Sequence, residues 1–308
     1  MALTGILRPG HVQMRVHDLQ ASVEFYTNIF GLLETGRDAA GRVYLKACDE
    51  RDHHSVILRQ ADQAGSDFYG FKVLNLATLN ELEGRLRDYG VATERIPAGE
   101  LLETGERVRF RAPTGHLFEL YAQKTEIGDG LGYVNPAVIV DDRKGLSPVR
   151  LDHWQLHGED LDGSRDLFVD VLGFSLAERI LCEDGERDMA VWLSCSNKAH
   201  DIAFVRDARS DTSHHSAFLM ESWEKLLYAA DLLAKKRVPI DIGPLRHGIT
   251  RGTSIYLFDP SGNRLETFCG GYNFYPDMKP YTWTWDEIGS AIFYHTRELN
   301  ERFLTVVT

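Results

Sequence analysis

Hydrophobic positions recur along the chain with two spacings, one typical of strands and one typical of helices. Residues 11–16 alternate as in a strand, and residues 19–30 place apolar side chains at helical spacing after Asp18, a good N-cap. Alternating stretches follow at 42–47 and 55–59. The order then starts again with a strand at 68–73 and a helix at 76–89. Gly31 and Gly90 end the two helices. This half is therefore predicted to contain two units of one strand, one helix and further strands.

A long-period repeat joins the two halves of the chain. Residues 111–121, RAPTGHLFELY, align with residues 258–268, FDPSGNRLETF, at an offset of 147, so that Glu119 meets Glu266. Residues 11–32 align with residues 153–174 at an offset of 142. The third and fourth units are expected to open at His153 and His215, with helices near 164–172 and 223–236. Because such a repeat outweighs local patterns, we predict an α+β fold of two tandem domains, each containing two units.

The predicted domains span residues 1–131 and 149–308, and the linker between them covers residues 132–148, where the periodicity is lost. The repeat ends at Gly270. Thr284 and Glu287 then form a capping box, which predicts a C-terminal helical extension from about residue 284. Its apolar stripe would contain Ile288, Ile292, His295 and Leu299.

Composition excludes several classes of partner. The chain has 46 acidic and 34 basic residues, a net charge of −12, and such a field repels nucleic acid and anionic membranes. No apolar stretch of 18 residues and no signal peptide is found, which favours a cytoplasmic protein. The four cysteines are too scattered for a metal knuckle and are expected to be reduced core thiols. They are Cys48, Cys182, Cys195 and Cys269.

Histidines are the main candidates for metal ligands in this chain. His153 and His215 open the third and fourth units, and Glu266 lies in the last strand of the fourth, so three strands can direct these side chains into one cavity. Two imidazoles and one carboxylate make a facial triad that leaves coordination positions open, as non-haem Fe(II) requires. Zinc is the rival metal, but the HExxH motif is missing. The N-terminal half has Phe68 at the position of His215 and is expected to bind no metal.

The other histidines leave alternatives. His214 competes with its neighbour as a ligand. Adjacent strand residues point to opposite faces, and periodicity does not choose between them. His157 shares a strand face with His153 but lies about 13 Å further along, too far for one metal. The remaining candidates are expected at the surface or in turns, and they are His53, His54 and His116.

Residues 247–266, HGITRGTSIYLFDPSGNRLE, resemble the signature of the extradiol ring-cleavage dioxygenases. The resemblance covers the whole chain, from RPGHVQ through SNKAHDIAF and IDIGPLRHG to NERFLTVVT, and is greatest to the catechol 2,3-dioxygenases. Leu245 departs from the small or β-branched residues usual at its position. The resemblance implies the vicinal-oxygen-chelate, or glyoxalase-like, fold of four βαβββ units.

The resemblance also implies roles for individual residues. The expected Fe(II) ligands are His153, His215 and Glu266. His200 would be the acid–base group beside O₂, since an imidazole titrates near neutrality. His247 and Tyr256 would hydrogen-bond and orient the substrate oxygen. The candidate apolar walls around the aromatic ring are Trp192, Ile249, Ile292 and Phe303.

The expected activity is therefore Fe(II)-dependent cleavage of catechol or a simple alkylcatechol by O₂, giving 2-hydroxymuconate semialdehyde, in aromatic catabolism. A homotetramer is implied by resemblance alone. Mn(II) accepts similar ligands, and the choice among methyl- and chlorocatechols depends on groups worth about 1–3 kcal/mol. Two other classes stay open. One is another metal enzyme of this fold, such as a glyoxalase-like isomerase or a thiol transferase, and the other is a non-catalytic protein that sequesters ligand.

Overall fold

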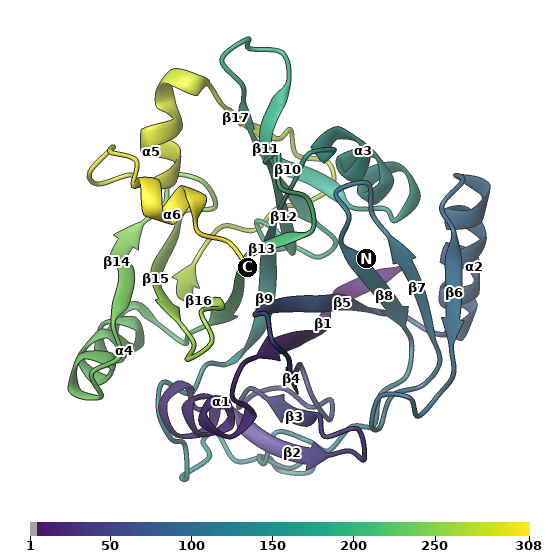
Figure 1. Cartoon of the computed structure of the whole chain (residues 1–308), viewed down its shortest axis with the longest axis vertical. Coiled ribbons are helices and arrows are strands. Elements are labelled where there is room, and N and C mark those ends of the chain that lie inside the picture. Colours follow the sequence, from purple (N-terminus) through teal and green to yellow (C-terminus); the bar gives the residue numbers. More distant parts are fainter. Residues whose placement is uncertain (1–4) are drawn as a thin grey trace.

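The structure is a computed structural model that describes residues 5–308 and contains two mixed sheets (Figure 1). The N-terminal sheet has eight strands in the order β2-β3-β4-β1-β5-β8-β7-β6. Their bounds are β1 Ile6–Val16, β2 Leu33–Arg37, β3 Val43–Lys46, β4 Val56–Gln60, β5 Gly65–Val73, β6 Thr93–Ile96, β7 Arg107–Arg111 and β8 Leu117–Tyr121. The opening strands β1 and β5 pair antiparallel at the centre, and each lies parallel to the last strand of its own unit.

The C-terminal sheet repeats this plan with nine strands in the order β14-β15-β16-β13-β9-β12-β11-β10-β17. Their bounds are β9 Arg150–Gly158, β10 Ser175–Leu181, β11 Asp188–Ser194, β12 Ile202–Arg206, β13 Thr212–Leu219, β14 Ile240–Arg246, β15 Gly252–Phe258, β16 Arg264–Gly270 and β17 Tyr281–Trp283. Again the opening strands β9 and β13 pair antiparallel, and β12 and β16 run parallel to them. Four strand–helix–three-strand units are therefore present, as the repeat predicted.

One helix follows each opening strand and begins at a polar cap. The helices are α1 Leu19–Phe25, α2 Leu76–Asp88, α3 Leu161–Asp166 and α4 Trp223–Lys235. The predicted cap Asp18 is confirmed, since its carboxylate accepts from the Ala21 N–H at 2.9 Å. Short π-helical turns, Tyr26–Phe30 (η1) and Leu167–Val171 (η2), extend α1 and α3. Gly31 ends the first at φ 91°, where a Cβ would lie 2.2 Å from the Lys144 carbonyl, so only glycine fits.

Strand register confirms the alignment of the two halves at atomic level. Gly70 on β5 pairs with both His11 and Glu119, and Ala217 on β13 pairs with both His153 and Glu266. Two residues along, Gln13 pairs with Phe68, and Gln155 pairs with His215. Phe68 therefore takes the structural place of His215, as the offset of 147 predicts.

A continuous aromatic core joins the two sheets. The fully buried Trp154 on β9 packs edge-on against Phe71 on β5, with ring centroids 5.2 Å apart. Phe30 from the first unit lies 4.9 Å from Phe218 in the fourth. Because these pairs cross between the halves, the two sheets bury one shared cluster of apolar side chains. No helix among residues 5–308 is long and apolar enough to cross a membrane.

The C-terminal extension is helical from Trp285, as predicted, but the apolar stripe from Ile288 to Leu299 is wrong because the segment is not one continuous helix. Residues 285–305 form a 3₁₀ turn Trp285–Glu287 (η3), a short helix α5 Ile288–Ile292 and a second short helix α6 Glu301–Thr305. Thr284 makes no side-chain cap bond. After Phe293 the Tyr294 N–H donates to the Arg246 carbonyl at 2.9 Å instead of continuing the helix. Backbone N–H groups of the loop after β14, those of Gly248 and Ile249, donate to the Ala291 carbonyl at the end of α5. The interrupted helix therefore folds back over the C-terminal sheet (Figure 1).

Candidate metal centre

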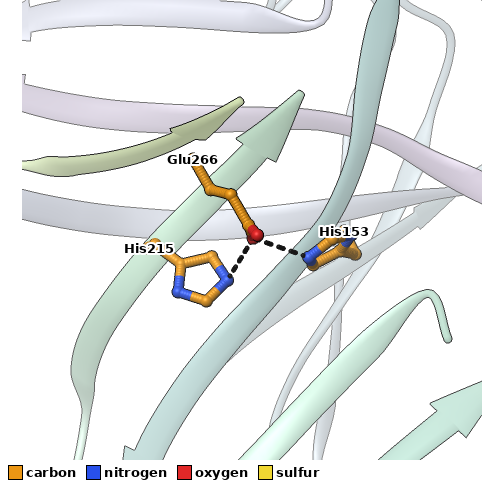
Figure 2. Close-up of side chains that lie close together, drawn as sticks. All are labelled: His153, His215 and Glu266. Carbon is orange, nitrogen blue, oxygen red and sulfur yellow. Dashed lines mark hydrogen bonds and ion pairs between the residues drawn. The ribbon is translucent and has the colours of Figure 1, made fainter. Parts of the chain in front are cut away.

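Three neighbouring strands of the C-terminal sheet bring together His153 from β9, His215 from β13 and Glu266 from β16 (Figure 2). The Glu266 Oε2 atom lies 3.1 Å from the Nε2 atom of His153 and 3.0 Å from that of His215. All three side chains are buried, and their potential ligand atoms lie within 4.8 Å of one another. The residues predicted as ligands thus form one compact cluster that could hold a metal ion.

The donor chemistry of this cluster fits a cation. The Nδ1 of His153 lies 3.1 Å from the Asp152 carboxylate, which can only accept, so this nitrogen carries a proton, and Nε2, which faces Glu266, is the nitrogen that an ion could bind. Burial alone would lower the pKa of His153, but hydrogen bonds to the two carboxylates outweigh it and raise the pKa. Burial lowers the pKa of His215 to about 4, against the opposing effect of Glu266, which leaves its ring neutral near pH 7. Two imidazole nitrogens and a carboxylate oxygen that converge in this way suit a bound cation, which would replace any proton between them.

A cavity of about 470 Å³ opens beside the cluster. It is lined by all three cluster residues and by the three predicted acid–base and orienting residues, His200, His247 and Tyr256. The four predicted wall residues also line it, and they are Trp192, Ile249, Ile292 and Phe303. The structure therefore brings all ten predicted site residues to one cavity, which is large enough for a small aromatic molecule.

The hydroxyl of Tyr256 lies between two possible acceptors, His247 and Glu266. The Nδ1 of His247 donates to the Ile292 carbonyl at 2.6 Å, which leaves Nε2 as an acceptor 2.9 Å from the Tyr256 hydroxyl. That hydroxyl also lies 2.8 Å from Glu266 Oε1. Burial and the nearby Glu266 carboxylate raise the pKa of Tyr256 well above its usual value, so it remains a phenol. A single phenolic proton therefore serves two acceptors.

His200 lies between the cluster and the open part of the cavity. Its ring centroid is 3.9 Å from that of His153. Burial and the neighbouring His153 hold the pKa of His200 well below its usual value, so the ring is a neutral base. The loop that carries it is pinned by Asp201, whose carboxylate accepts from the backbone N–H groups of Cys195 and Ser196.

The loop at residues 247–252 has a strained backbone and is hydrogen-bonded to a carboxylate from another unit. Thr250 and Arg251 both have positive φ, 54° and 58°, which costs non-glycine residues about 1–2 kcal/mol each. The Thr250 N–H donates at 2.7 Å to the carboxylate of Glu178 on β10, which is only 2% exposed. Burial raises the pKa of Glu178 to about 7. Sequence reasoning missed this contact, because residue 178 belongs to a different unit.

Several predictions for the other histidines are wrong. His214 does not point away from His215, because a β-bulge between Ser213 and His215 lets the two rings meet, with their Nδ1 atoms 2.7 Å apart. His53 and His54 are not surface residues, since they are 6% and 1% exposed.

His116 directly follows the predicted turn but is buried. The cysteines are unpaired among residues 5–308, although Cys182 and Cys195 are only half-buried.

In the N-terminal half, two arginines surround the carboxylate that corresponds to Glu266. Glu119, the counterpart of Glu266, accepts from Arg107 Nε at 2.8 Å and from Arg109 Nε at 2.9 Å. Arg109 pairs with Glu119 across β7 and β8 where Tyr256 pairs with Glu266 across β15 and β16. Burial would raise the pKa of Glu119, but hydrogen bonding to His11 and the two guanidiniums lower it to about 2. The offset of 147 could have revealed these two arginines.

The ring of His11 is also oriented differently from that of His153. Its Nδ1 faces the buried amine of Lys124 at 3.0 Å rather than a carboxylate. When the amine donates there, the His11 proton remains on Nε2 and points at Glu119, 3.4 Å away. Nδ1 is thus held by an amine in His11 and by a carboxylate in His153, so only in His153 is Nε2 the nitrogen left for an ion.

Comparisons with known proteins agree with this geometry. Residues 66–125 match the model for the catechol 2,3-dioxygenase-like N-terminal domain, and residues 150–267 match the glyoxalase/bleomycin resistance protein/dioxygenase superfamily. The chain is 52% identical over 305 residues to metapyrocatechase from Pseudomonas sp. (strain CF600), covering 99% of each chain.

A manganese-dependent 2,3-dihydroxybiphenyl 1,2-dioxygenase from Geobacillus genomosp. 3 is 28% identical, with 96% of this chain and 95% of that one covered. Among solved structures, the 2,3-dioxygenase LapB from Pseudomonas sp. KL28 superposes with a TM-score of 0.91 at 55% identity, covering 92% of this chain and 99% of that one. The chain therefore belongs to the catechol 2,3-dioxygenase (metapyrocatechase) family of extradiol dioxygenases.

Proposed function

We propose that this protein is an Fe(II)-dependent dioxygenase that cleaves catechol or a simple alkylcatechol beside its two hydroxyls, giving 2-hydroxymuconate semialdehyde from catechol. The observation that carries the proposal is the buried cluster of two imidazole Nε2 atoms within 3.1 Å of one carboxylate oxygen, on the wall of a cavity. His153, His215 and Glu266 would hold the ion. A facial triad of this kind leaves positions open for a bidentate substrate and for O₂.

When bound, the ferrous ion would supply a Lewis acid for both catechol oxygens and a route for electrons between the ring and O₂. Mn(II) accepts the same donors, and one relative is manganese-dependent by name. We propose iron because two imidazoles and one carboxylate are the ligand set typical of non-haem Fe(II) oxygenases.

Tyr256 and His247 would bind and orient the substrate oxygens. The Tyr256 proton can be given to Glu266 Oε1 or to His247 Nε2, because both lie within 2.9 Å of the hydroxyl. When Glu266 binds an ion, its oxygens become weaker acceptors, and the phenolic proton is expected to turn to His247. The phenolic oxygen of Tyr256 then has a lone pair that can accept from a catechol hydroxyl.

His200 would act as the general acid–base group. It is a neutral imidazole in the cavity wall, in contact with the ring of His153. A neutral base at this position can take a proton from a catechol hydroxyl and return it to an oxygen later in the reaction. Positioned groups of this kind are typically worth 10²–10⁴-fold in rate.

The apolar walls suit an aromatic ring with a small substituent. Trp192 and Ile249 belong to one buried cluster, and Phe303 belongs to another around Tyr256. Ile292 packs against both clusters. These walls would exclude water and hold the ring flat beside the ion.

We further propose the domain boundaries 1–131, 132–148 and 149–308, which agree with the two sheets. We also propose a cytoplasmic homotetramer. Family resemblance is the basis for the tetramer, and the four unpaired cysteines among residues 5–308 favour a reducing compartment.

The proposal is tested by loading the purified chain with Fe(II) under anaerobic conditions and adding catechol and then O₂. We expect oxygen uptake equal to the catechol consumed, and a yellow ring-opened product. A chain that holds iron but consumes no oxygen would refute the dioxygenase assignment in favour of another metal-dependent reaction of this fold. Loading with Mn(II) instead shows which ion supports turnover.

A further inference from the structure

The β-bulge on β13 places His214 in a position that a regular strand would not allow. Both halves contain a bulge at the equivalent place, with Asp67 on β5 in one and His214 on β13 in the other. The carboxylate of Asp67 is bound by Arg15 and Arg59. Only in the C-terminal half does the bulge carry a histidine, and only there does the next residue belong to the metal cluster.

A chain of hydrogen bonds runs from the C-terminal helix to this cluster. The Nε2 of His214 lies 2.6 Å from the backbone carbonyl of Phe303 in α6, and its Nδ1 lies 2.7 Å from the Nδ1 of His215. The carbonyl can only accept, so His214 carries its proton on Nε2 and its Nδ1 is an acceptor. His215 must then donate from Nδ1, and its Nε2, 3.0 Å from Glu266, is the nitrogen left for an ion.

The carbonyl at the start of this chain is held firmly. The Phe303 ring packs on His214, with centroids 4.7 Å apart, and on Tyr256 at 4.8 Å. The buried Arg264 donates to the Val306 carbonyl at 2.7 Å. Thr308 pairs with Ser213 through two backbone hydrogen bonds, of 2.7 and 3.0 Å, directly beside the bulge. The last residues of the chain are thus fastened to the strand that carries both histidines.

We propose that His214 is a positioning residue for the metal site. It holds His215 in the tautomer that presents Nε2 to the ion, and the Phe303 carbonyl in turn fixes the tautomer of His214. This inference rests on the proposed function, because it assumes that His215 is a metal ligand. Its consequence is that the C-terminal helix contributes to metal affinity although none of its side chains is expected to bind the ion.

Two nearly isosteric variants separate the two ends of the hydrogen-bond chain. In His214→Asn the amide oxygen can take the place of Nδ1 and still accept from His215, but nothing reaches Phe303. In His214→Gln the amide can reach the Phe303 carbonyl, but the acceptor for His215 is lost. We expect the Gln variant to bind Co(II) about 10–100-fold more weakly than the unmodified chain, the usual effect of losing such a partner. We expect the Asn variant to stay within about threefold.

The measurement is a Co(II) titration followed by the visible spectrum of the bound ion, which requires no turnover. His116→Gln is the matched control, because His116 is also buried and its Nε2 also meets a backbone carbonyl, that of Thr212, at 3.0 Å. It should bind Co(II) as the unmodified chain does. If His214 only anchored the tail, the Asn variant would be the weaker binder, and that order would overturn the inference. Equal affinities for the two His214 variants would overturn it as well.

The unmodified chain offers a second test, which holds even if a variant fails to fold. Long-range ¹H–¹⁵N spectra of histidine-labelled, Zn(II)-loaded protein should show the proton on Nδ1 in His215 and on Nε2 in His214. A His215 proton on Nε2 would refute the inference while leaving the dioxygenase activity to its own assay. A chain that binds no divalent metal at all would refute both.

Discussion

Phe68→His gives the N-terminal half the third residue that the C-terminal cluster has, and we expect it to create no second metal site. The reason lies in Glu119, whose two oxygens already accept from Arg107 and Arg109. Arg107 and Glu119 are both fully buried, so an ion could bind only by breaking their pair. Breaking a buried pair costs about 3–5 kcal/mol. Since 1.4 kcal/mol is a factor of ten, the added site should bind about 10²–10⁴-fold more weakly than the C-terminal one.

The assay is metal analysis after equilibration with Fe(II) under anaerobic conditions, at a concentration that just saturates the unmodified chain. We expect one ion per chain in both the unmodified protein and Phe68→His. The double variant Phe68→His/His215→Ala is the control and should hold none, because it retains only the N-terminal set. Two ions in the single variant, or one in the double, would refute the argument that guanidinium replaces the metal.

Three further predictions concern the C-terminal half. His215→Ala should abolish iron retention while Phe68→Ala leaves one ion per chain, because only the C-terminal half has three ligands, and elemental analysis of both variants decides this. His200→Asn should keep iron but slow turnover about 10²–10⁴-fold, and loss of iron in step with the rate would instead make His200 a ligand. Glu178 has its pKa raised by burial to about 7, so the folded chain binds this proton more tightly than the unfolded one, whose pKa is near 4.5. Its contribution to stability is therefore fully present below about pH 4.5 and is lost as pH rises through 7. At about 1.4 kcal/mol per pKa unit the loss of stability amounts to about 3 kcal/mol. Glu178→Gln should remove this pH-dependent loss, which urea unfolding at pH 5 and pH 8 measures. If the unmodified chain and Glu178→Gln lost the same stability between the two pH values, the prediction would be contradicted.

Much of this protein follows from the sequence alone, because a duplication compares the chain with itself. The alternation of strand and helix spacing predicted the four units, and polar caps such as Asp18 marked where helices begin. The two offsets aligned His11 with His153 and Glu119 with Glu266 before any contact was known, and the strand register confirms both pairs. These features depend on local spacing and on repetition, which the order of residues records directly.

Other features depend on contacts between distant parts of the chain, and only the tertiary structure decided them. Strand periodicity sends His214 and His215 to opposite faces, but one bulge brings their rings together, and the C-terminal tail supplies the carbonyl that orients them. The helix α5 ends early because the Tyr294 N–H donates to the backbone carbonyl of Arg246. A bulge, a broken helix and a buried hydrogen bond are each decided by which groups meet in space and must be satisfied there. The linear pattern of polar and apolar residues does not specify those partners.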